Sequence, residues 1–206
     1  AHDCEFETWH DGVFKYMKSL KAFHVSNPSC KYYTEKGVLY TDDLEILYKS
    51  VDLIEDELEE FKLNDKRGKV LVAVPPAYPT DDFVIPDGVV AICSRAFDGC
   101  SFSTIQIPDT LKIIGYNVFD SLDTLKTIFV PNIKPVFLGD VNIGRQKEDI
   151  SIQPRRGIEL EKEVDVFWEE ALGIFDFEEL DFGEQDFTDA YSMPYFCRSL
   201  VFPCIS

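Results

Sequence analysis

The sequence predicts an irregular α/β repeat solenoid, rich in β-structure, with a short parallel sheet, an accessory β-hairpin and one inserted helix. Three observations predict it: a repeated unit, an apolar triplet that recurs inside the unit, and a proline after the triplet. Residues 85–107 read IPDGVVAICSRAFDGCSFSTIQI, and residues 107–130 read IPDTLKIIGYNVFDSLDTLKTIFV. Ile85 recurs as Ile107 and Phe97 as Phe119, each 22 residues later. A fixed period of this length indicates stacked units that cannot bury a core alone.

The recurring triplet has apolar residues at spacings of three and then two. Alternation over its last part is typical of a strand, so we expect the apolar members to point into the solenoid and the residues between them to point outward. Pro86 and Pro108 follow the strands directly. We expect them to end the strand pairing, because proline has no N–H to donate to a sheet. The triplet occurs as Leu20, Phe23 and Val25, as Phe102, Ile105 and Ile107, and as Leu125, Ile128 and Val130.

Two weaker triplets follow in the C-terminal part of the chain, at 177–182 and 197–202. The last apolar positions of the series are then Val130, Leu160, Phe182 and Phe202, which an insertion near 132–156 would explain. Chance in a Phe-rich tail explains the series equally well. We therefore expect a single domain over 1–206, with the best repeats at 83–131 and degenerate repeats or a cap at 132–206.

An accessory hairpin and a helical insertion are expected within 31–74. The run from Lys36 to Tyr48 predicts two strands around a turn at 41–43. The segment 52–63 places apolar residues at helical spacing after Asp52, a possible N-cap, and carries a solvated acidic face.

Composition limits the classes of partner. The 206 residues carry a formal net charge of −18, which would repel a phosphate backbone, so we expect no nucleic-acid partner. Solubility is the simplest reason for the acidity, and recruitment of a basic ligand is the alternative. No window approaches 18 uninterrupted apolar residues, so we expect no membrane span.

The cysteines and histidines indicate neither a cofactor nor a metal site. Six cysteines are too sparse for a disulfide scaffold, and none has the C-x-x-C spacing of a zinc site. Cys100 and Cys197 are interpreted first as small buried apolar residues and second as disulfide partners. Cys4 with His10 is only a weak metal-binding signal.

The repeated motif resembles the BspA-type leucine-rich repeat family, whose units share the pattern IP-x-x-V-x-x-I-G-x-x-A-F-x-G-C. Residues 20–48 resemble the family's accessory unit, and Cys93 departs from the pattern where glycine is usual. The resemblance implies a right-handed leucine-rich-repeat solenoid, extracellular or displayed at a cell surface, that adheres to a host or neighbouring-cell protein without catalytic residues. The residues that carry the match are Ile85, Pro86, Val89, Ile92, Ala96, Phe97, Gly99 and Cys100.

The predicted function is a non-catalytic module that binds a protein ligand through the outer face of the repeat sheet. Stacked strands align outward side chains into columns, and exposed apolar residues among polar ones are typical of interface anchors. Coverage of Phe129 by the 132–156 insertion or by a neighbouring molecule is an equal alternative for that residue. The candidate residues are His24, Asp82, Val84, Thr104, Gln106, Thr127 and Phe129, and Asp181 and Val201 could extend one column.

Two alternatives belong to other classes. A hydrolase could use paired carboxylates such as Glu169-Glu170 or Glu178-Glu179, but the chain has no G-x-S-x-G, H-E-x-x-H or phosphate-loop motif, and its three histidines all precede residue 25. A structural or assembly protein could use the acidic tail 159–191 to contact a subunit or to bind calcium, although that tail lacks the alternating calcium loop.

Overall fold

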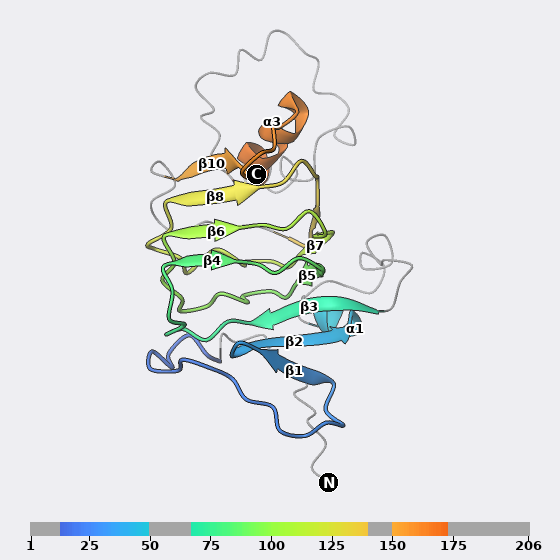
Figure 1. Cartoon of the computed structure of the whole chain (residues 1–206), viewed down its shortest axis with the longest axis vertical. Coiled ribbons are helices and arrows are strands. Elements are labelled where there is room, and N and C mark those ends of the chain that lie inside the picture. The colour runs from blue at the N-terminus through green and yellow to red at the C-terminus, as the bar shows by residue number, and fades with distance from the viewer. Residues whose placement is uncertain (1–12, 50–66, 140–149, 173–206) are drawn as a thin grey trace, which may run out of the picture.

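The computed structural model describes residues 13–49, 67–139 and 150–172, and it shows two sheets stacked into a solenoid (Figure 1). The first, sheet B, contains β4 (Asp82–Val84), β6 (Thr104–Gln106), β8 (Thr127–Val130) and β10 (Ser151–Pro154). Its strands are parallel and lie in the order β10-β8-β6-β4. Stacking of the repeats into a parallel sheet is confirmed.

The second sheet, sheet A, is built mostly from the short apolar stretches between the triplets. Its order is β1-β2-β3-β5-β7-β9, so the expectation of one parallel sheet was incomplete. The strands are β1 (Tyr32–Glu35), β2 (Val38–Asp43), β3 (Arg67–Ala73), β5 (Val89–Ile92), β7 (Ile113–Ile114) and β9 (Val136–Phe137). From β3 to β10 the chain alternates between the two sheets, so each coil gives one strand to each sheet.

The main core lies between the sheets, where equivalent residues of successive coils stack on one another. Phe83 pairs in register with Ile105, and Ile105 with Ile128. Phe97 and its repeat equivalent Phe119 are both fully buried, with ring centroids 6.1 Å apart and an interplanar angle of 17°. Units 85–107 and 107–130 therefore share one conformation and lie against each other, as the repeat predicted.

A second apolar cluster covers the other side of sheet A. Alternate residues of β3 divide between the two clusters: Leu71 joins the main core, and Val70 and Val72 join the second cluster. The short helix α1 (Glu45–Lys49) contributes buried Ile46 and Leu47 to this cover. Sheet A is thus packed on both sides, whereas sheet B has the main core on one side only.

The accessory hairpin exists, but its predicted turn was wrong. The turn is Lys36-Gly37, with φ values of 50° and 83°, which joins β1 to β2 as a two-residue loop. Thr41 and Asp43 end β2 instead, and Asp43 Oδ1 accepts the Glu45 N–H at 3.1 Å where α1 begins. The predicted second strand is therefore helix α1, and the helix predicted at 52–63 lies outside the described residues.

The expectations at both ends of the repeat series also need correction. Residues 20–25 form no strand, since the Phe23 N–H donates to the Gly37 carbonyl instead of joining a sheet. In sheet B the strand after β8 is β10, with Ile152 opposite Ile128, so the stack resumes inside the range 132–156 that was predicted as an insertion. Helix α3 (Lys162–Ala171) follows, and its buried Trp168 donates Nε1–H to the Pro131 carbonyl at 3.3 Å. The triplets predicted at 177–182 and 197–202 fall beyond the described residues.

Candidate binding surface

The outer side of sheet B presents two columns of aligned side chains, which we call the outer face. Strict parallel register holds the columns together, because equivalent residues of β4, β6, β8 and β10 lie directly beside one another. The strands alternate between buried and partly or fully exposed positions, as expected when one side of a sheet contacts the core. One column contains Asp82, Thr104, Thr127 and Ser151, and the other contains Val84, Gln106, Phe129 and Gln153.

The outer face combines apolar anchors with hydrogen-bonding groups. Val84 is 57% exposed, and Phe129 is half-buried within its column. Thr104 Oγ1 donates to Asp82 Oδ1 at 2.8 Å, which orients the carboxylate along the face. Such a surface can contact apolar side chains and donate or accept hydrogen bonds over several strands at once.

Six of the seven predicted site residues lie in these columns, and one does not. His24 is exposed on the irregular segment beside the hairpin turn and belongs to no strand, because the triplet at 20–25 does not enter sheet B. The prediction missed Ser151 and Gln153. Their signal was the alternation around Ile152 followed by Pro154, which the spacing of 24 residues from Ile128 obscured.

Asp181 and Val201, which were predicted to extend one column, lie outside the described residues. Gln153 of β10 is the neighbour of Phe129 in its column, and covering of Phe129 by the segment 132–156 or by a neighbouring molecule stays a hypothesis, because residues 140–149 lie outside the described part. Phe129 is a half-buried member of the face.

The carboxylates proposed for a hydrolase do not form an enclosed site in the described residues. Glu169 and Glu170 are consecutive residues of α3, and Glu170 is exposed. Burial, with a smaller contribution from Asp165, raises the pKa of the Glu169 carboxyl. Glu178 and Glu179 lie outside the described residues, as does most of the acidic tail.

Within 13–49, 67–139 and 150–172 no three His, Cys, Asp or Glu side chains are placed to hold a metal ion. In the same residues no helix has the length and apolar character needed to cross a bilayer. Cys4 and His10 precede the described part.

The buried carboxyl of Asp98 joins two successive coils of the repeat. Asp98 accepts a hydrogen bond from Ser121 Oγ of the next coil at 3.2 Å, and burial raises the pKa of its carboxyl. Cys100 is buried as predicted, and burial raises the pKa of its thiol to about 12. A thiol with so high a pKa is protonated at neutral pH and is a poor nucleophile. Cys30 is also a free thiol.

Comparison with known proteins supports the reading of the repeat. A search of curated proteins and a search of solved structures each returned no match. The sequence model of one family does match, and its description is BspA type leucine rich repeat region (6 copies). The match spans residues 78–137, which contain β4 to β9 and therefore most of the outer face. Residues 78–137 are therefore similar to BspA-type leucine-rich repeats, which agrees with the stacked coils of the structure.

Proposed function

We propose that the protein is a non-catalytic adhesion module that holds another protein against the outer face of sheet B. The observation that carries this proposal is the asymmetry of the two sheets. The outer side of sheet A is packed under Leu44, Ile46 and Leu47, while no helix or strand of the described residues lies over the two aligned columns of sheet B. Anchors such as Val84 and Phe129 beside polar neighbours match the composition of protein interfaces.

The partner that fits this surface is a host extracellular protein or a protein on a neighbouring cell, with the module secreted or displayed at a cell surface. The net charge of −18 disfavours an acidic partner. Moderate affinity for each copy suffices, because many tethered copies bind a surface with avidity. The proposed unit is one domain over 1–206.

Substitution of Phe129 tests this function. The protein, immobilised on beads, is exposed to detergent-extracted surface proteins of candidate partner cells, and the recovered proteins are compared between variants. Phe129→Ala should reduce recovery of the specific partner several-fold, since anchor residues carry most of the binding free energy. The control is Val136→Ala, which removes an apolar side chain that is 38% exposed on sheet A.

Two outcomes would contradict the proposal. The first is equal recovery by the Phe129→Ala and wild-type proteins. The second is a loss of about 3–5 kcal/mol of unfolding free energy in Phe129→Ala, because that loss is typical of a core phenylalanine.

A further inference from the structure

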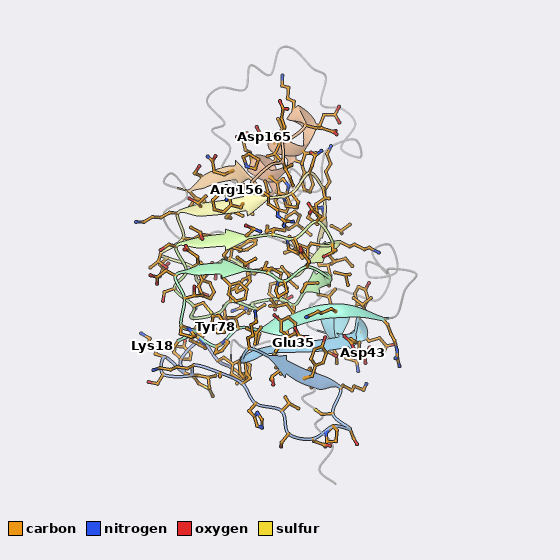
Figure 2. The ribbon with its side chains drawn as sticks, in the orientation of Figure 1. Lys18, Glu35, Asp43, Tyr78, Arg156 and Asp165 are labelled. Atoms are coloured by element: carbon orange, nitrogen blue, oxygen red, sulfur yellow. The ribbon has the colours of Figure 1, made fainter. Side chains whose placement is uncertain are left out.

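Residues 13–23, which we call the strap, follow one side of the solenoid without forming a helix or a strand. The Leu20 carbonyl of the strap accepts the Ala77 N–H at 2.9 Å, and the Phe23 N–H donates to the Gly37 carbonyl at 2.8 Å. In Figure 2, Lys18 marks the strap at the lower left of the molecule. The second half of the strap is thus bonded to the hairpin turn and to the segment before β4.

The first residues of the strap lie against the turn between β5 and β6. Gly99 contacts Lys15 there, since a Cβ added to Gly99 would lie 2.7 Å from the Lys15 carbonyl oxygen. Val13 and Phe14 of the strap line a cavity together with residues of the turn at 94–98. The cavity measures about 20 Å³, which is room for about one water molecule.

The carboxyl of Asp98 lines this cavity and is almost cut off from solvent. Only 6% of its side chain is exposed. Its Oδ1 accepts the Ser121 hydroxyl at 3.2 Å, and its Oδ2 has no hydrogen bond within the described residues. An ionised carboxyl loses free energy of hydration when it is buried with an unpaired oxygen. Closure of the strap over Asp98 is therefore less favourable when this carboxyl is ionised.

The charged groups around Asp98 offset this loss only in part. Arg95 Nη1 lies 3.9 Å from Asp98 Oδ2, and Lys15 of the strap also attracts the carboxylate. Asp120 of the next coil repels it, and the buried Cys100 thiol beside it is uncharged at neutral pH. Burial is the largest influence and raises the pKa of the Asp98 carboxyl above its ordinary value.

The strap changes this balance because it supplies one wall of the cavity. When the strap lifts, water reaches the carboxyl, and the pKa of Asp98 moves toward the ordinary value for aspartate. The closed strap therefore binds a proton at Asp98 more tightly than the open strap does. By linkage, closure is most favourable below the ordinary pKa and weakens as the pH rises through the pKa of the closed state.

We propose that the strap is a pH-sensitive cover of the solenoid, which closes tightly over protonated Asp98 and opens more readily when that carboxyl is ionised. Opening releases the hairpin turn and the segment before β4 from their hydrogen bonds to the strap. It also exposes the apolar cavity walls Val72, Val74 and Ala96, which are buried while the strap is closed. This inference concerns closure of the fold and does not rest on the proposed binding function.

Hydrogen exchange of the Ala77 amide measures closure, because its acceptor is the Leu20 carbonyl of the strap. The observed rate is divided by the intrinsic rate at each pH, so that only opening is compared. In the wild type the protection of this amide should fall several-fold between about pH 4 and about pH 7. The Ile107 amide, which donates to the Phe129 carbonyl in sheet B, reports global unfolding and is the internal control.

Three variants connect the pH dependence with the carboxyl. Asp98→Asn keeps the size of the side chain and an acceptor for Ser121 but cannot ionise, so the protection of Ala77 should no longer depend on pH. Asp123→Asn is the matched control, since Asp123 is exposed on the next coil and its substitution should leave the wild-type pH dependence unchanged. Lys15→Met removes an attraction to the ionised carboxylate and should steepen the loss of protection.

The proposal is wrong if Asp98→Asn keeps the pH dependence of the wild type, or if the protection of Ala77 rises with pH. NMR titration of the Asp98 carboxyl in the wild type gives an answer that does not depend on any variant folding. A pKa above the ordinary aspartate value supports the proposal, and a pKa at or below that value overturns it.

Discussion

Sheets A and B belong to the same coils, yet their outer sides differ in what covers them. β5 of sheet A reads VVAI, with three of its four residues buried, and β7 is buried at both positions. β6 and β8 of sheet B read TIQ and TIFV, and their residues alternate between buried and half-buried. A strand packed on both sides needs apolar residues throughout, whereas a strand packed on one side needs them only at alternate positions.

This difference separates the outer side that contributes to stability from the side that the proposed function uses. On sheet A, α1 and the residues that pack beside it form the second cluster, so that side contributes to stability. On sheet B, no described helix or strand lies over β4, β6 and β8 (Figure 1), and the residues that alternate with the core residues are half-buried or exposed. Substitutions on the outer side of sheet A should therefore lower the free energy of unfolding more than substitutions on the outer side of sheet B.

The largest expected effect is in the core that both sheets share. Phe97 is fully buried and contacts the rings of Phe83, Phe102 and Phe119. Phe97→Ala should lower the free energy of unfolding by about 3–5 kcal/mol, because it leaves a cavity between stacked coils. Chemical denaturation measures the change, and a loss below about 1 kcal/mol would be incompatible with a ring stack at the centre of the core.

The next largest effect is expected on the outer side of sheet A. Leu47 of α1 is fully buried in the second cluster. Leu47→Ala should cost about 2–5 kcal/mol, the range of a buried leucine. Lys49→Ala is a matched control in the same helix, since Lys49 is exposed and its loss should change stability by no more than about 0.5 kcal/mol. Equal stability of Leu47→Ala and Lys49→Ala would mean that α1 does not cover sheet A.

A moderate effect is expected from a buried hydroxyl at the end of β2. Thr41 is fully buried on the outer side of sheet A, where its Oγ1 donates to the Lys31 carbonyl at 2.8 Å and accepts the Asp43 N–H at 3.2 Å. Thr41→Val keeps the volume and leaves both backbone groups without this partner. The expected loss is about 1–3 kcal/mol by thermal or chemical unfolding. An unchanged stability would show that water replaces the hydroxyl.

Much of this comparison could be predicted from the sequence, because the repeated residues can be recognised directly by their spacing. The equivalence of Phe97 and Phe119 and the inward direction of Ile105 and Ile128 follow from spacing alone. The same spacing aligned Thr104 with Thr127. These features depend on local periodicity, which each unit carries within its own residues.

The remainder depends on contacts between distant segments, which periodicity does not encode. The run at 89–92 is as compatible with a buried loop as with a strand of a second sheet, and only pairing with β3 decides between them. Residues 45–48 were predicted as strand but follow Asp43, whose carboxylate accepts the Glu45 N–H, and they belong to helix α1. The different N-terminal ends of the two sheets could not be predicted either, because sheet A continues beyond β3 through β2 and β1 while sheet B ends at β4.

The smallest effect is expected from the same substitution on the outer face of sheet B. Thr104 is half-buried, and its Oγ1 donates only to the exposed Asp82 carboxylate. Thr104→Val should change the free energy of unfolding by no more than about 0.5 kcal/mol, because water solvates the freed carboxylate and valine is well tolerated in a strand. The comparison of Thr104→Val with Thr41→Val keeps the substitution the same and changes only the sheet on which it is made. Equal losses for the two variants would mean that the outer face is covered like sheet A. A stable Thr104→Val protein that binds its partner less well would instead locate binding on the outer face.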